Sequence, residues 1–155
     1  MIVLPKISKL ELLNKVLKDE DIILKLYQNN YIPDDNTLLS NFTEANFDGY
    51  SAIVLDKIDL STTEWTTPSI SFFPCSEEGS SGYSGTSGYN EAITANTPQS
   101  WTCGDTGNTV YGYYMVGATS NILLWSDAFE IPRTLGSTDV ISITPQLQLK
   151  TIPQC

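Results

Sequence analysis

Short runs of apolar and aromatic residues, many alternating with polar ones, recur along most of the chain. Clusters of glycine, asparagine, aspartate and proline separate these runs, which is the pattern of strands joined by turns. The densest run is Val110–Val116, in which Tyr111 and Tyr113 are expected to share one strand face. The pattern predicts strands at residues 22–27, 50–56, 69–73, 98–103, 110–116, 122–125, 140–144 and 146–151. Short strands at this spacing predict an antiparallel β-sandwich or jelly roll.

The first and the last predicted strands differ in their expected burial. Residues 22–27 are mostly apolar, so we expect this strand to be buried on both faces. From Ile141 to Leu149, apolar and polar residues alternate, which predicts one buried and one solvated face. Pro145 divides this stretch into two strands, because a residue without an N–H is tolerated at a bulge or an edge.

A helical pattern precedes the strands. Apolar residues between Leu10 and Leu17 recur at spacings of three and four, which predicts an amphipathic helix over residues 8–18. Ser8 and Glu11 have the spacing of a capping box, in which the Ser8 hydroxyl accepts from the Glu11 backbone N–H. This helix either covers an open edge or end of the sandwich or docks into a partner.

Two segments have no clear period. Residues 38–47 fit either one short helix or a partly ordered loop. Residues 77–90, rich in glycine, serine and tyrosine, predict either an exposed hairpin or flexible loop, or a contact loop. The whole chain, residues 1–155, is expected to form one domain with an N-terminal arm at 1–7, a helix at 8–18 and a β-sandwich at 21–152 that includes the loop 77–90.

Charge and composition restrict the possible partners. Eight Lys+Arg against 18 Asp+Glu give a formal net charge of −10, which disfavours nucleic acid and anionic membranes. Charged residues make up only 17% of the chain, a value that suits an assembly protein and β-rich proteins in general. The start of the chain does not fit a secretory signal, and no segment has the ~20 apolar residues that cross a bilayer. We therefore expect a soluble protein made in the cytoplasm.

The residues that usually carry catalysis are few. The chain has no histidine, the side chain that titrates near neutral pH, and no Gly-x-Ser-x-Gly motif. A pair of carboxylates could hydrolyse glycosides, but nothing in the pattern marks such a pair among Glu64, Asp105, Asp127 and Glu130. We therefore expect a protein that is not an enzyme and binds no cofactor.

Cysteines and loop carboxylates indicate no metal site. Cys75, Cys103 and Cys155 lack CxxC spacing, and no histidine completes a mixed zinc site. A Cys75–Cys103 bridge is geometrically conceivable, whereas synthesis in the cytoplasm favours free thiols. Oxygen ligands cluster at residues 34–36 and 104–108, as in calcium loops and also in ordinary turns.

Five phrases of the sequence resemble a group of small structural proteins of tailed-phage virions. These phrases are Leu24–Asn30, Phe42–Tyr50, Val110–Val116, Leu123–Phe129 and Ile141–Pro145. The resemblance covers most of the chain and is weakest from Trp65 to Ser100. It implies a β-sandwich virion component without catalytic residues, located on the capsid or on the tail.

The resulting interpretation is a non-enzymatic virion protein, made in the host cytoplasm, that decorates or cements the capsid by bridging shell subunits. The alternative is a tail adaptor, fibre, or receptor- or carbohydrate-binding tail component, and a third option is a cellular carbohydrate-binding module. Expected partners are the major capsid protein or tail proteins, with homo-oligomers on the particle. The predicted partner-binding residues are Ile2, Leu4, Trp65, Tyr83, Tyr89, Trp101 and Ile152.

The tryptophans distinguish two of these interpretations. If Trp65 and Trp101 are exposed and coplanar, glycan binding is favoured, because exposed aromatic rings can stack on sugars. If a neighbouring subunit covers both rings, assembly is favoured. Trp125 lies in an apolar run and is expected to belong to the core.

Overall fold

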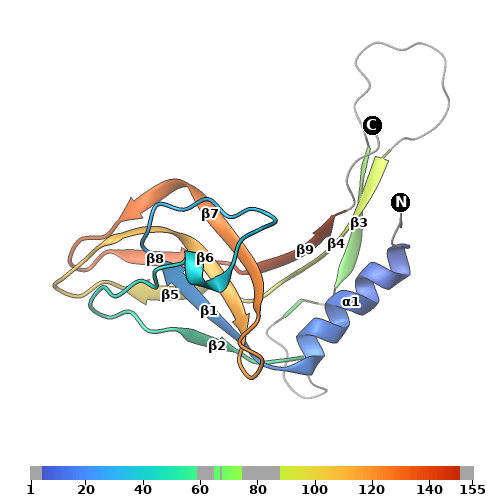
Figure 1. Cartoon of the computed structure of the whole chain (residues 1–155), viewed down its shortest axis with the longest axis horizontal. Coiled ribbons are helices and arrows are strands. Elements are labelled where there is room, and N and C mark those ends of the chain that lie inside the picture. Colours follow the sequence, from blue (N-terminus) through green and yellow to red (C-terminus); the bar gives the residue numbers. More distant parts are fainter. Residues whose placement is uncertain (1–4, 59–64, 67, 75–87, 151–155) are drawn as a thin grey trace, which may run out of the picture.

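The computed structural model describes residues 5–58, 65–66, 68–74 and 88–150. One helix precedes a series of strands whose pairings are all antiparallel, which confirms the predicted all-β class with a short N-terminal helix. Figure 1 shows an elongated molecule with a β-sandwich at one end and the helix at the other.

The first layer is a four-stranded sheet with the strand order β2-β1-β6-β7. Its strands are β1 (Ile22–Tyr27), β2 (Ile53–Leu55), β6 (Thr109–Gly117) and β7 (Leu123–Thr134). β1 is buried on both faces, as predicted: Leu26 belongs to the main core and Tyr27 to a smaller cluster on the outer face of the sheet.

The second layer is a long ribbon interrupted near its middle. Its strands are β3 (Ser69–Pro74), β4 (Gly88–Ala95), β5 (Gln99–Thr102), β8 (Val140–Ile143) and β9 (Gln146–Lys150). β4 pairs with β3 and β9, while β5 pairs with β8. At the interruption, the Asn96 N–H donates to the Pro145 carbonyl at 2.9 Å. The hydrogen-bonded pairing of the ribbon is therefore interrupted at Pro145, where the sequence predicts a division between two strands.

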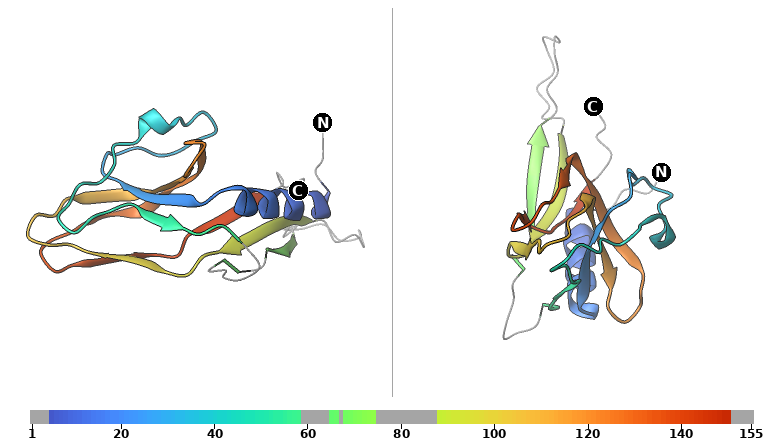
Figure 2. Two further views of the ribbon diagram at one scale, coloured as in Figure 1. Left: turned by 90° about the horizontal axis from the view of Figure 1, so that it is seen from below. Right: turned by 90° about the vertical axis from the view of Figure 1, so that its left-hand side faces the viewer.

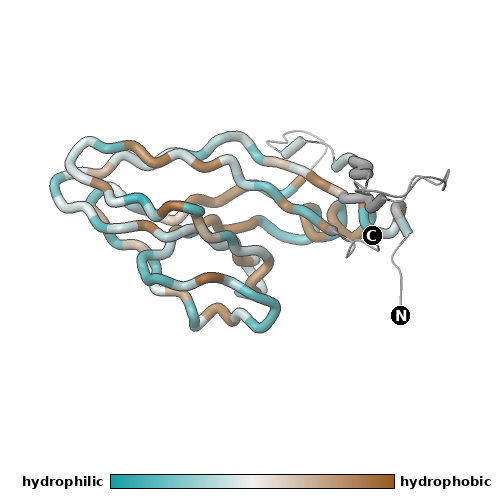
Figure 3. Tube along the Cα trace, turned by 90° about the horizontal axis from the view of Figure 1, so that it is seen from above, coloured by the Kyte–Doolittle hydropathy of each residue, from teal (hydrophilic) through white to brown (hydrophobic). Residues whose placement is uncertain are grey.

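The main core lies between the two layers. Leu24 and Met115 of the first layer pack in one cluster with Ile143 and Leu147 of the second. Burial of each such side chain stabilises the fold by about 1.5–3 kcal/mol. Apolar and polar positions alternate along much of the strand path in Figure 3, as the period of two requires.

The helix α1 (Lys6–Asp19) starts earlier than predicted. Pro5 is the N-cap residue, and its carbonyl accepts from the Lys9 N–H at 3.2 Å. The predicted capping box at Ser8 is therefore wrong. Proline tolerates the start of a helix, because its φ is already helical and its missing N–H would have no helical partner.

One face of α1 covers the second layer. Leu13 and Leu17, which lie on the predicted apolar stripe, are fully buried. The helix contacts β3, β4 and β9, and Figure 2 shows it lying along this part of the ribbon. The helix thus covers a face of the β3-β4-β9 sheet, including its middle strand β4, rather than the predicted open edge. Docking of the helix into a partner stays a prediction.

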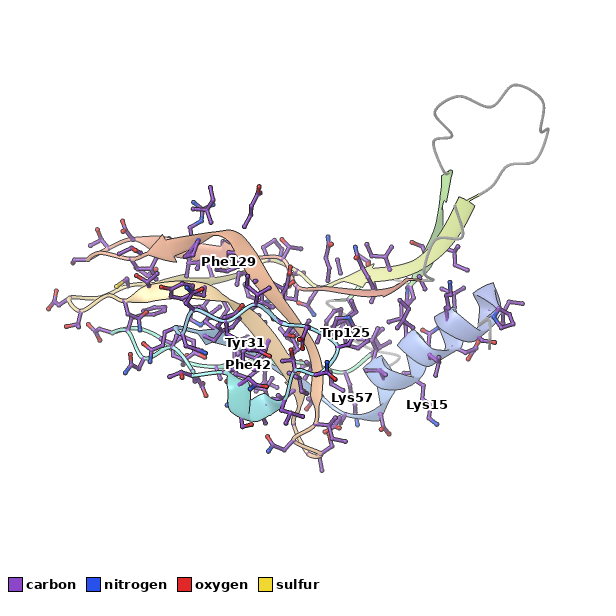
Figure 4. The ribbon with its side chains drawn as sticks, turned by 45° about the horizontal axis from the view of Figure 1, so that its top comes forward. Lys15, Tyr31, Phe42, Lys57, Trp125 and Phe129 are labelled. Carbon is purple, nitrogen blue, oxygen red and sulfur yellow. The ribbon has the colours of Figure 1, made fainter. Side chains whose placement is uncertain are left out.

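The segment of residues 28–44 folds over the outer face of the first layer, whereas the following Ala45 and Phe47 pack in the main core. It contains η1 (Leu39–Asn41), the short helix that was one of two options for this region. Phe42 stacks on Tyr114 with ring centroids 4.6 Å apart, and Tyr31 meets Phe42 edge-on. Figure 4 shows Tyr31 and Phe42 together beside the sheet. Aromatic packing thus fixes a long segment that has little regular structure.

An irregular register separates two tyrosines of β6. The pairing of β6 with β7 shifts between Val110 and Gly112. As a result, Tyr111 packs in the outer cluster, whereas Tyr113 packs in the main core. The prediction that these two tyrosines share a face is wrong, because an unpaired residue reverses the alternation of faces.

Two strands extend beyond the predicted ones. β4 begins at Gly88, so residues 88–90 of the predicted loop belong to a strand, and its continuation to Ala95 was not predicted. β7 continues to Thr134 instead of ending at Trp125. Because β7 is long, its second half lies beside β8, and residues of both strands line the same surface hollows.

Candidate functional site

The two tryptophans predicted to meet a partner are buried by the chain itself. Trp65 and Trp101 are each 4% exposed and belong to the main core. Their indole N–H groups donate to the carbonyls of Asp56 at 3.1 Å and Ser51 at 2.7 Å. The prediction that both rings bind a partner is therefore wrong, since neither a sugar nor a neighbouring subunit reaches them.

Most of the other predicted contact residues lie outside the described residues. These are Ile2, Leu4, Tyr83 and Ile152. Cys75 and Cys155, which were considered for a disulfide or a metal site, also lie outside the described residues. Tyr89 lies in β4, where its backbone pairs with that of Phe73. The contribution of these contact residues to binding stays a prediction.

Hydrogen bonds to aspartates hold the backbone of the two loops that were considered as calcium sites. Asp34 Oδ1 accepts from the Asn36 N–H at 2.9 Å and from the Thr37 hydroxyl at 3.2 Å. Asp48 Oδ2 accepts from the Asp105 N–H at 3.0 Å. Within the described ranges, three or more cysteine, aspartate or glutamate side chains do not gather in any group that could hold a metal ion. These loops are therefore shaped by turn chemistry.

Cys103 is a free thiol in the core. Its side chain is 1% exposed, and burial raises its pKa, with smaller contributions from Asp139 and Asp48. A raised pKa disfavours the thiolate, the reactive form of cysteine. Cys103 therefore acts as a small apolar core residue.

The second half of β7 forms a surface with β8. Residues 129–132 lie between the paired positions Ala128 and Arg133 and have no partner in β6. Two adjoining hollows of about 500 and 290 Å³ lie there and share Arg133, Ile141 and Ser142 among their lining residues. We define the β7–β8 surface as Ile131, Pro132, Arg133, Val140 and Ser142.

Exposed apolar side chains flank an arginine on this surface. Ile131 is 66% exposed and Val140 is 61% exposed. Arg133 is the only arginine of the sequence, is exposed, and forms no ion pair with any residue that the structure describes. Arginine is enriched in protein interfaces, where its planar guanidinium binds carboxylates and carbonyls. The combination therefore has the chemistry of a protein-binding surface.

The backbone here is poorly suited to strand addition. The irregular β7 and Pro132 interrupt the row of N–H and C=O groups that an incoming strand would pair with. A partner would therefore bind mainly through side chains. The sequence analysis missed this surface because the strand that it predicts ends at Trp125. Phe129 and Ile131 nevertheless alternate with Glu130 in a strand-like pattern.

Comparison of the chain with protein-family models, with curated proteins and with solved structures found no match. Among the described residues, no helix is long and apolar enough to cross a membrane.

Proposed function

We propose that this protein is a non-enzymatic structural component of a phage virion that decorates or cements the capsid. The observation that carries the proposal is the β7–β8 surface, where exposed Ile131 and Val140 flank Arg133. Exposed apolar groups on two neighbouring strands, each paired within its own sheet, favour attachment to another protein, since little conformational entropy is lost on binding.

Two further features support an assembly role. The sequence phrases quoted above resemble virion structural proteins and imply a β-sandwich. The net charge of −10 would favour docking on a basic region of a partner. Within the interface, Arg133 would bind a single carboxylate or carbonyl group of that partner.

The first test measures attachment to particles that lack this protein. Purified chain is added to such particles, and the amount that co-sediments is determined by quantitative mass spectrometry. Ile131→Asp is expected to weaken attachment about tenfold or more, because it places an unpaired charge in the apolar part of the interface. Ile122→Asp is the matched control, because Ile122 is also exposed (60%) but precedes β7, away from the surface.

The copy number distinguishes the capsid from the tail. Many copies per particle, with density over the shell in a cryo-EM reconstruction, would support decoration. Few copies on the tail axis would instead support the tail adaptor or fibre. Absence of binding, or equal binding by the two aspartate variants, would contradict the proposal.

A further inference from the structure

The two layers leave an open cleft between the edge strands β7 and β9. This cleft has a volume of about 330 Å³, at the small end of the range for small-molecule sites. β7 is the last strand of the first sheet and β9 the last strand of the β3-β4-β9 sheet, so the cleft lies at a lateral seam of the sandwich. Its lining residues are Tyr113, Trp125, Ser126, Asp127, Gln146 and Gln148.

Trp125 differs from the other tryptophans that the structure describes. Trp65 and Trp101 are almost fully buried, and their N–H groups donate to backbone carbonyls. Trp125 is only partly buried, and its N–H has no hydrogen-bond partner in the described part of the chain. Figure 4 places Trp125 between β7 and β9. Trp125 packs against the main core and also lines the cleft, where its N–H is therefore available to a ligand.

Polar side chains without internal partners lie across from this ring. Gln146 and Gln148 are two residues apart on β9, which places their side chains on the same face. The side-chain amide groups of Gln146 and Gln148 form no hydrogen bond with another described residue. The Asp127 carboxyl also lines the cleft, and burial raises its pKa.

The cleft is also held in a defined shape. Tyr113 is 8% exposed and belongs to the main core, and its ring packs 6.4 Å from that of Phe129. This packing holds the β6 side of the cleft in place. The lining residues thus extend from paired strands, which limits the entropy lost when a ligand binds.

We propose that this cleft binds a neutral sugar ring of a glycan. A partly buried indole that lines a cleft can pack against the apolar face of a pyranose, while amides and a carboxylate exchange hydrogen bonds with its hydroxyl groups. Asp127 and the absence of any cation among the lining residues disfavour phosphate and other anions. The lining contains one carboxylate, and hydrolysis of a glycoside requires two, so the chemistry is that of binding.

The test uses the full chain and a panel of neutral saccharides. Glucose, galactose, mannose, N-acetylglucosamine and their β- and α-linked disaccharides are screened by saturation-transfer NMR, and isothermal titration calorimetry gives the affinities of those that bind. Gln146→Ala is expected to weaken binding about tenfold, which corresponds to the loss of one hydrogen bond. Trp125→Phe is expected to weaken it further, and Thr144→Ala, an exposed neighbour outside the cleft, to leave it unchanged.

Several outcomes would overturn the inference. These are saturation transfer to none of the sugars, equal affinities of Gln146→Ala and Thr144→Ala, and binding of tetramethylammonium in place of sugars, which would indicate a cation site. Gln146 is exposed, so its substitution does not endanger folding, and circular dichroism checks this. The inference goes beyond the proposed function, because attachment to particles is measured separately with Ile131→Asp.

Discussion

At the residue scale, Gly112 shows how closely packed the irregular part of β6 is. A Cβ at this position would meet the Asp127 carbonyl oxygen and the Tyr27 hydroxyl. The same hydroxyl donates to the carbonyl of Tyr31 at 3.1 Å. A side chain at Gly112 would therefore displace the backbone of β7 or break the contacts of Tyr27.

We expect Gly112→Ala to destabilise the fold by about 1–3 kcal/mol, measured by urea denaturation. Gly136→Ala is the control, because its Cβ would lie 3.5 Å from the flexible Asp139 carboxylate, an ordinary contact. This variant is expected to change the free energy of unfolding by less than about 0.5 kcal/mol. Equal effects of the two substitutions would show that Gly112 is not sterically required.

At the element scale, the segment of residues 28–44 depends on aromatic side chains more than on backbone pairing. Its backbone meets β1 at the bridge between Tyr27 and Glu44, next to the Ala45 N–H to Leu26 carbonyl bond of 2.9 Å. Phe42 contacts three tyrosine rings there, with centroids 4.6–5.6 Å apart. Removal of this ring should release the segment without unfolding the sheet beneath it.

Phe42→Ala is accordingly expected to cost about 2 kcal/mol of stability, below the value for a fully buried phenylalanine. Hydrogen exchange measured by NMR should show faster exchange at residues 28–44 and unchanged protection in the centre of β1. Leu38→Ala, at a 64% exposed position of the same segment, serves as the control. Faster exchange throughout the sheet would contradict the separation of the segment from the main core.

At the scale of the whole molecule, buried tyrosines link the stability of both clusters to pH. Burial, with a smaller effect of the Asp127 charge, raises the pKa of Tyr27 and of Tyr113 to about 12. Burial and the charge of Glu44 raise the pKa of Tyr114 to about 12. Because the folded protein holds these protons more tightly than the unfolded chain, stability is fully present below pH 10 and falls as pH rises towards 12.

We expect tyrosinate absorbance from these residues to appear together with alkaline unfolding. Tyr113→Phe should make the loss of stability between pH 10 and 12 smaller, because one of the titrating groups is absent. Urea denaturation at a series of pH values measures this slope. An unchanged slope would show that Tyr113 titrates in the folded protein as it does in the unfolded chain.

The position of β7 also matters for the whole molecule. As an edge strand it contributes Trp125 and Asp127 to the seam with β9 and Ile131 and Arg133 to the β7–β8 surface. The two candidate sites therefore lie at different places along one strand.

Local patterns along the sequence were sufficient for much of the fold. The alternation around Ile141, Ile143 and Leu147 identified the buried face of β8 and β9, and the spacing of Leu13 and Leu17 identified the buried face of α1. These predictions succeeded because strand and helix periodicity place side chains on a face regardless of what covers it. The candidate sites were predicted less well, since Trp65 and Trp101 proved to be core residues.

The sequence by itself determined the β-rich class, the helix and the faces of the regular strands. Only the tertiary structure decided which tryptophan reaches a cleft, because the exposure of Trp65, Trp101 and Trp125 depends on where the two layers close and where the seam stays open. The register shift that separates Tyr111 from Tyr113 was decided in the same way. Such features arise from contacts between residues distant in sequence, which local periodicity does not encode.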